Sequence, residues 1–373
     1  MTALAKPALG QTVIDPQFGT TIRRITAVPV SEGAKAIIKP MYSTMPAWNI
    51  DESKLILWHR GRGHELYDGR TYAFIRELPL ESPTDIEQVL WDPVDPDILY
   101  YPSNYNAQPR FMRYRVSTNT SELVRDFGTA PTNCPVDWGK VLSIGSDPQY
   151  LSWEPKKIIG LKCGNTKFIY DIAANDTLGV KSFTTSNAPI VAPSGDLAYF
   201  EGDVYDIGLN LLRSLVMTNP EHANIGRDAN GADVYNTASF DDADPGALIS
   251  YALSTGSRKV IIGPKNGWPY TPSGTHISSL AFKNPGWVAV SMVGYQADGK
   301  SILDNELALA NVSSGQVCRI GHHRSKAGKG PWEYWAEPHN VISPSGTRVL
   351  FGSDWGGSDS VDSYVVELPS YNP

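Results

Sequence analysis

Residues 341–351, VISPSGTRVLF, show the pattern that decides the fold. A short apolar strand leads into a Pro-Ser-Gly turn and then into a second apolar strand, which is the signature of a β-hairpin. The chain contains seven such units, and the other six are residues 47–58, 89–100, 150–161, 190–200, 223–235 and 277–290. A unit that recurs in this way along the whole chain predicts a repeat architecture.

Most of these hairpins are followed by a third strand and a short fourth strand, as in residues 247–253 and 258–261. Seven units of four strands predict an all-β, seven-bladed β-propeller. The last unit lacks a fourth strand, and residues 20–26 resemble one, so we expect an N-terminal strand to close the last blade. We expect one domain over 1–373, with 1–15 as an N-terminal extension. One or two β-sandwiches are the alternative, because they also contain alternating strands.

The composition narrows the class of protein and of partner. Gly and Pro are frequent (33 and 28 of 373 residues), and charged residues make up only 19%, which excludes coiled coils and disordered chains. The net charge is −7 without a basic cluster, so we expect no nucleic-acid partner. The longest apolar runs are too short to cross a membrane, so we do not expect a membrane as a partner. The sequence does not indicate the oligomeric state.

The three cysteines, Cys134, Cys163 and Cys318, are widely spaced and odd in number, so they predict neither a disulfide framework nor a CxxC metal site. Residues 1–10 lack the apolar core of a signal peptide. We therefore expect a cytoplasmic protein, with secretion or a periplasmic location as the alternative if a leader has been removed.

The histidines are the main candidates for a functional site. His222, His276 and His339 each stand at the start of the first strand of the fifth, sixth or seventh unit. First strands are innermost in a propeller, so three equivalent positions should converge at one mouth of the central channel. An imidazole cluster of this kind predicts a site for a divalent metal, with Glu337 as an oxygen ligand. The alternative is that each histidine makes only local hydrogen bonds.

Aromatic side chains in loops of the same face form a second candidate set. Tyrosine and tryptophan can stack on sugar rings while their polar atoms form hydrogen bonds. The candidates for substrate binding are Tyr295, Tyr334, Trp335 and Trp355. Packing between blades is an equally plausible role for them. The GxSxG, P-loop and strand-linked GxGxxG motifs of other enzyme classes are missing from the sequence.

With these residues placed, the chain resembles the propeller polysaccharide lyases, such as oligogalacturonate lyase and ulvan lyase. The specific part is the run EPHNVISPSG at 337–346, which is similar to a stretch in which a metal-binding histidine precedes a Ser-Pro turn. His276 is similar to a second ligand of that family. Glu337 occupies the position where the family has another histidine.

The resemblance implies β-elimination on an acidic oligosaccharide or polysaccharide that contains uronic acid. A cation must neutralise the substrate carboxylate, and a base must remove the neighbouring proton. The cation would be a divalent metal (manganese, calcium or zinc) on the histidines, or else Arg60, Arg62 and Arg227. The base would be His59, His64 or His322. A non-catalytic propeller that binds carbohydrate or protein is the competing interpretation, so the sequence favours an enzyme without deciding the question.

Overall fold

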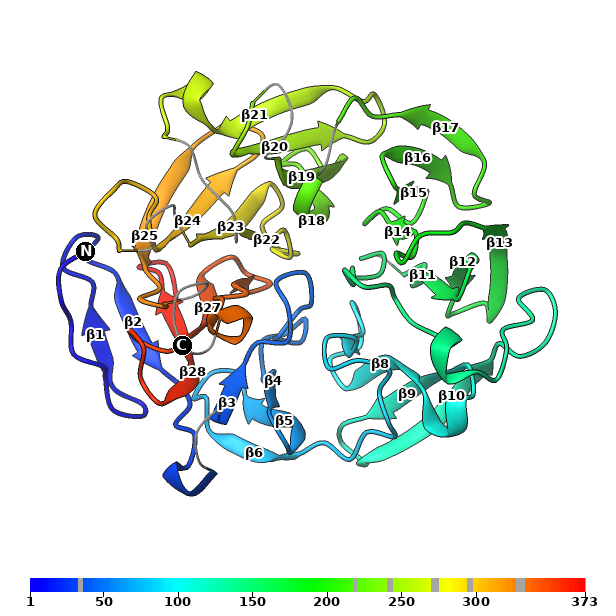
Figure 1. The fold of residues 1–373 in the computed structure, drawn as a ribbon, viewed down its shortest axis with the longest axis horizontal. Helices are drawn as coiled ribbons and strands as arrows, with labels where there is room; N and C mark the ends of the chain where they lie inside the picture. The colour runs from blue at the N-terminus through cyan, green and yellow to red at the C-terminus, as the bar shows by residue number, and fades with distance from the viewer. Residues whose placement is uncertain are drawn as a thin grey trace.

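The computed structural model describes residues 1–32, 36–153, 155–217, 220–239, 244–269, 275–293, 298–326 and 333–372. Over these residues the chain is all-β, interrupted by 3-10 helices of three or four residues. These helices are η1 (Val30–Glu32), η2 (Tyr105–Ala107), η3 (Trp138–Lys140), η4 (Pro264–Asn266) and η5 (Glu333–Ala336). Figure 1 shows the sheets arranged in a ring, with early strands of each sheet near the centre. This arrangement is that of a β-propeller.

Five of the sheets are antiparallel and follow the chain order, each strand pairing with the next. The first contains β7 (Leu90–Trp91), β8 (Ile98–Ser103), β9 (Arg110–Arg115) and β10 (Thr120–Asp126). The second contains β11 (Ile158–Cys163), β12 (Thr166–Asp171) and β13 (Asp176–Ser182). The third contains β14 (Ile190–Val191), β15 (Leu197–Phe200), β16 (Asp203–Asp206) and β17 (Leu211–Ser214). The fourth contains β18 (Pro220–Arg227), β19 (Asp233–Ser239), β20 (Ala247–Ala252) and β21 (Arg258–Ile262). The fifth contains β22 (His276–Ser278), β23 (Trp287–Met292), β24 (Glu306–Asn311) and β25 (Val317–His322).

The remaining strands form a nine-stranded sheet that joins the two ends of the chain. Its C-terminal strands are β26 (Val341–Ile342), β27 (Arg348–Ser353) and β28 (Ser360–Glu367). Its N-terminal strands are β1 (Thr12–Ile14), β2 (Thr21–Arg24), β3 (Ala36–Lys39), β4 (Lys54–His59), β5 (Gly63–Asp68) and β6 (Phe74–Glu77). β28 contacts β3 through a short parallel pairing of two residues.

The expected pairing of an N-terminal strand with the last strand of the chain is confirmed. β2 runs antiparallel to β28, with Thr21 opposite Glu367 and Arg24 opposite Tyr364. The Arg23 guanidinium also pairs with the Glu367 carboxylate at 2.8 Å. β2 is not the outermost strand, however, because β1 pairs with its other edge. Part of the segment expected as an extension therefore belongs to the sheet.

The hairpin pattern predicted most strand pairs correctly. The hairpin at residues 341–351 forms β26 and β27, and its turn closes with a bond from the Gly346 amide to the Ser343 carbonyl (2.8 Å). Gly346 has φ +74°, a conformation that glycine adopts without strain. The units at residues 47–58 and 150–161 differ, because their first halves form no strand. Trp48 makes only an isolated bridge with Leu55, and the Ser152 amide donates to the Ile158 carbonyl.

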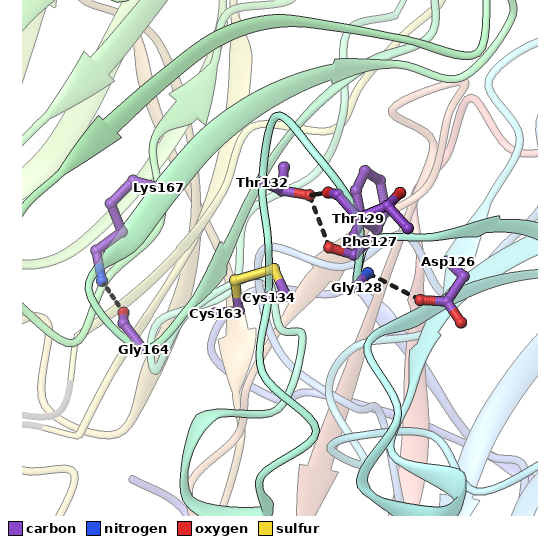
Figure 2. The surroundings of a disulfide bond; sticks show 9 residues. All are labelled: Asp126, Phe127, Gly128, Thr129, Thr132, Cys134, Cys163, Gly164 and Lys167. Carbon is purple, nitrogen blue, oxygen red and sulfur yellow. Dashed lines mark hydrogen bonds between the residues drawn. A yellow bond between two sulfur atoms is a disulfide. The ribbon is translucent and has the colours of Figure 1, made fainter.

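A disulfide between Cys134 and Cys163 joins the connection after β10 to the second sheet, a feature that the cysteine spacing did not predict (Figure 2). Cys134 lies in the connection after β10, and Cys163 is the last residue of β11. The connection is held locally by a bond from the Thr132 hydroxyl to the Phe127 carbonyl at 2.7 Å. Cys318 is free. In the described part of the chain, no helix has the length and apolar character needed to cross a bilayer.

Candidate functional site

The structure brings His222, His276 and His339 together. The His222 and His276 rings stack with centroids 4.3 Å apart and planes 17° apart, and the His339 ring meets His276 edge-on at 4.4 Å. His222 lies in β18, His276 begins β22, and His339 precedes β26, so each comes from the inner end of a different sheet. Equivalent positions in successive sheets therefore bring the three imidazoles into contact, and Figure 1 shows β18, β22 and β26 to belong to neighbouring parts of the ring.

Glu337 completes a group that is suited to a metal ion. Its Oε2 atom lies 3.6 Å from the Nε2 atom of His276 and 3.6 Å from that of His339. One donor atom from each of these three residues falls within 4.8 Å of the others. Two donor atoms on one tetrahedral ion lie about 3.4 Å apart, so the two 3.6 Å spacings require little adjustment. Imidazole nitrogen with carboxylate oxygen is a donor set that suits zinc or manganese.

Two of the three histidines in this cluster are held in the neutral form. Burial lowers the pKa of His222 and of His339, and the neighbouring Lys39 lowers the pKa of His339 further. Both rings are therefore neutral at physiological pH, as a metal ligand must be. The buried Nε2 atom of His339 has no hydrogen-bond partner within the described residues. His339 also has φ +41°, a backbone strain that often accompanies functional sites.

Lys39 is a buried lysine that contacts the cluster through His339. It is 1% exposed at the end of β3, and its Nζ atom lies 2.9 Å from the Nδ1 atom of His339. The same amine donates to the carbonyls of Glu337 (3.1 Å) and Trp335 (3.4 Å). Burial lowers the pKa of Lys39 to about 7. Lys39 was not among the predicted site residues, although a single lysine inside the apolar run AIIKPMY at 36–42 is an unusual pattern.

Two tyrosines and two acids surround the cluster, and three of these four residues were also missed. Tyr42 packs edge-on against His276 and His339, at 5.6 and 5.1 Å between ring centroids. Tyr334, a predicted substrate-binding residue, lies 4.9 Å from the His339 ring, and its hydroxyl donates to Glu87 at 2.8 Å. Burial raises the pKa of Glu87 and of Asp147 to about 7. Acidic residues are common in loops, so nothing in the sequence around Glu87 and Asp147 indicated that they lie beside the histidine cluster.

The predicted base His59 is held between two carboxylates. Its Nδ1 atom lies 2.6 Å from Glu65, and its Nε2 atom lies 2.6 Å from Glu32. These carboxylates outweigh burial and raise the pKa of His59, which favours the protonated ring. Arg62 also pairs with Glu32, at 2.6 Å. Both ring nitrogens of His59 are thus engaged, and the structure does not bring His59 or Arg62 to the histidine cluster.

The other candidate bases also have local partners. The Nε2 atom of His64 bonds the Ile86 carbonyl at 2.8 Å, and burial lowers the pKa of this ring. His322 lies 3.2 Å from the Asp15 carboxylate through its Nδ1 atom and is 1% exposed. Of the candidate histidines, only the three inner-strand residues meet in one cluster within the described chain.

The remaining candidates fall partly near the cluster and partly away from it. Trp335 stacks on Trp58 at 5.2 Å, and the Arg60 guanidinium lies 5.7 Å above its ring. The Trp335 carbonyl accepts a hydrogen bond from Lys39, which contacts His339, so Trp335 and the Arg60 side chain above it lie next to the cluster. Arg227 contacts the Trp153 ring at 5.7 Å. It lies five residues from His222 at the other end of β18, roughly 17 Å away along an extended strand.

Trp355 has a structural role in this arrangement. Its ring stacks on Tyr364 at 4.7 Å, and its Nε1 atom donates to the Leu4 carbonyl at 3.0 Å. It therefore fastens the N-terminal segment to β28 rather than facing the histidines. The predicted substrate-binding residue Tyr295 lies outside the described residues.

Two solved structures have the same architecture as this chain. One is an oligogalacturonate lyase in complex with manganese, with a TM-score of 0.66 and 16% sequence identity over 96% of both chains. The chain shares the fold of oligogalacturonate lyases. A second such structure, from Vibrio parahaemolyticus, gives a TM-score of 0.64 and 14% identity, again over 96% of both chains. No family model and no curated protein sequence matches the chain.

Proposed function

We propose that this protein is a lyase that cleaves a uronic-acid-containing glycan by β-elimination at the mouth of the ring. One observation carries the proposal: His276, Glu337 and His339 form a metal-binding geometry in a fold shared with oligogalacturonate lyases. We also propose that the ring is one domain of seven blades. Dividing the nine-stranded sheet at its short β28–β3 contact gives one blade of β26, β27, β28 and β2 and another of β3 to β6.

His276, Glu337 and His339 would hold a divalent metal such as manganese. When bound, that ion supplies positive charge that neutralises the substrate carboxylate and acidifies the adjacent C–H bond. Lys39 keeps the His339 ring in place through the 2.9 Å contact at Nδ1, and its carbonyl bonds fix the backbone of Glu337. These contacts hold two of the three ligands in position before substrate arrives.

The proton acceptor we propose is His222, because the predicted bases His59, His64 and His322 are engaged elsewhere. Its Nδ1 atom lies 2.9 Å from the Thr275 carbonyl, so the neutral ring carries its proton there and leaves Nε2 unprotonated. Nε2 would take the proton from the carbon next to the carboxylate. The electron pair of that C–H bond forms the new carbon–carbon double bond, and the glycosidic oxygen departs and takes up a proton from solvent.

Incubation of the protein with pectate, alginate, ulvan and glucuronan oligomers tests the proposal. We expect the ultraviolet absorbance of an unsaturated uronate to appear with at least one of them. His222→Ala should lower kcat by roughly 10²-fold or more with a smaller change in KM. His322→Gln is the matched control, because His322 is a buried histidine on the outer strand β25 whose Nδ1 atom lies 3.2 Å from the Asp15 carboxylate of the N-terminal segment. Absence of an unsaturated product from every glycan would favour the non-catalytic carbohydrate-binding alternative.

A further inference from the structure

A polar cavity of about 490 Å³ is lined by residues of β15 and β19 and of the connections around them. Three connections contribute to its lining: Ser146 and Asp147 come from the connection before β11, Asn187 from the connection before β14, and Glu201 from the turn between β15 and β16. Tyr199 and Tyr235 line it as a stacked pair, with ring centroids 4.1 Å apart and planes 27° apart. The cavity is large enough for a sugar residue, and none of the proposed catalytic groups lines it.

Asp147 connects this cavity to the metal triad. It lines the cavity and interacts with the Tyr42 hydroxyl, and the Tyr42 ring packs edge-on against both His276 and His339. On the neighbouring side, Gln149 donates to the carbonyl of Ala223, the residue after His222, at 2.9 Å. A glycan with one unit at the triad can therefore place an adjoining unit in the cavity.

The charges at the cavity select against a second uronic acid. Glu201 is acidic, Asp147 becomes negatively charged only near neutral pH because burial raises its pKa to about 7, and the described residues that line the cavity include no lysine or arginine. A uronate carboxylate placed there would face like charge without a counter-ion, which disfavours its ionised form. The same side chains suit sugar hydroxyl groups, because carboxylates accept their hydrogen bonds and amides both donate and accept.

The cavity is also arranged in advance for such contacts. The Asn187 amide donates to Glu201 at 3.0 Å, and the Ser146 hydroxyl donates to the Asn187 side-chain oxygen at 2.9 Å. The buried Oδ1 atom of Asp147 has no hydrogen-bond partner within the described chain. An unsatisfied buried acceptor is costly, so a ligand hydroxyl that donates to it gains stabilisation. The tyrosine rings offer apolar surface for the sugar ring.

We propose that this cavity binds an uncharged sugar residue adjoining the uronic acid at the triad, so that the substrate is a glycan that joins uronic acid to neutral sugar rather than a homopolymer of uronate. This inference rests on the proposed lyase function and specifies its substrate class. It also explains how an acidic site can accept an acidic glycan, since only one unit in the bound segment carries charge.

The test compares kcat/KM for two oligosaccharides of equal length: oligogalacturonate, and an oligomer in which galacturonic acid alternates with rhamnose. We expect the alternating oligomer to be preferred by roughly tenfold or more. Glu201→Arg introduces a cation at the rim and should shift the ratio toward oligogalacturonate by roughly tenfold. Glu122→Gln is the matched control, because Glu122 lies on the outer strand β10 and pairs only with Arg113 among the described residues. It should leave the ratio unchanged.

The possible failures are distinguishable. Preference of the wild type for oligogalacturonate, with a ratio that Glu201→Arg does not move, overturns the cavity proposal while the lyase function stands. Cleavage of neither oligomer removes support for the lyase function. In that case, calorimetric titration with a rhamnose-containing disaccharide decides the cavity proposal: binding that Glu201→Arg weakens supports it, and absence of binding overturns it.

Discussion

Glu87 is a carboxyl group whose surroundings favour its protonated form. Burial raises its pKa to about 7, and the Tyr334 hydroxyl that donates to it does not reverse this shift. The folded protein therefore retains a proton that the unfolded chain releases near the ordinary carboxyl pKa. Because the unfolded state binds fewer protons in this interval, stability falls as the pH rises through it.

Replacement of Glu87 by Gln should remove this pH dependence while preserving the acceptor for Tyr334. Between about pH 5 and pH 8, we expect wild-type stability to fall by about 1–2 kcal/mol relative to Glu87→Gln, a value reduced for the partial exposure of the group. Urea unfolding at each pH measures this difference. Parallel pH profiles for the two proteins would show that Glu87 is ionised in the fold.

At the residue scale, the sequence predicted those site residues whose place in the hairpin repeat determines where they lie in the fold. His222, His276 and His339 could be assigned because they occupy equivalent places in successive hairpins, and the fold brings such places together. Lys39 and Asp147 could not be assigned in this way. The roles of Lys39 and Asp147 depend on burial and on contacts with distant loops, and these two properties cannot be predicted from the neighbouring residues in the sequence.

At the scale of elements, the disulfide is the strongest link that the sequence did not predict. Cys134 and Cys163 are 29 residues apart, and their pairing depends on how the connection after β10 folds against the end of β11 (Figure 2). The strands themselves were predictable, because alternation and turn residues are local properties. Disulfides persist in oxidising environments, so we propose the secreted or periplasmic alternative over the cytoplasmic expectation.

Cys134→Ser should lower the free energy of unfolding by about 2–4 kcal/mol, because it releases the loop that the disulfide closes. Cys318→Ser is the matched control, since Cys318 is free, and it should change stability by less than about 0.5 kcal/mol. Denaturant unfolding under non-reducing conditions measures both. Equal stability of the two variants would mean that the disulfide contributes nothing to the fold.

At the scale of the whole molecule, closure of the ring depends on the N-terminal segment. β2 pairs with β28 along four residues, and Ile22 in β2 is fully buried. The β2–β28 contact covers an edge that would otherwise be open to pairing with other chains. The repeated antiparallel sheets were predictable because the hairpin recurs along the chain. The addition of β1 outside β2 was not, because its three residues carry no distinctive pattern.

Ile22→Ala should therefore destabilise the whole fold by about 2–4 kcal/mol in one cooperative transition. Val13→Ala in the outer strand β1 is the control, because Val13 is only partly buried, and it should cost less than about 1 kcal/mol. Thermal unfolding followed by circular dichroism compares them. A larger loss for Val13→Ala than for Ile22→Ala would contradict closure through β2.

The proposed lyase activity depends most on a metal held by His276, Glu337 and His339. The most direct measurement is the rate of unsaturated uronate formation by one protein sample before chelation, after chelation and after addition of Mn²⁺. We expect the rate to be lost on chelation and restored by Mn²⁺ in the wild type, and His276→Ala to show no restoration although it remains folded. A wild-type rate that chelation leaves unchanged, or full activity of His276→Ala, would contradict the account.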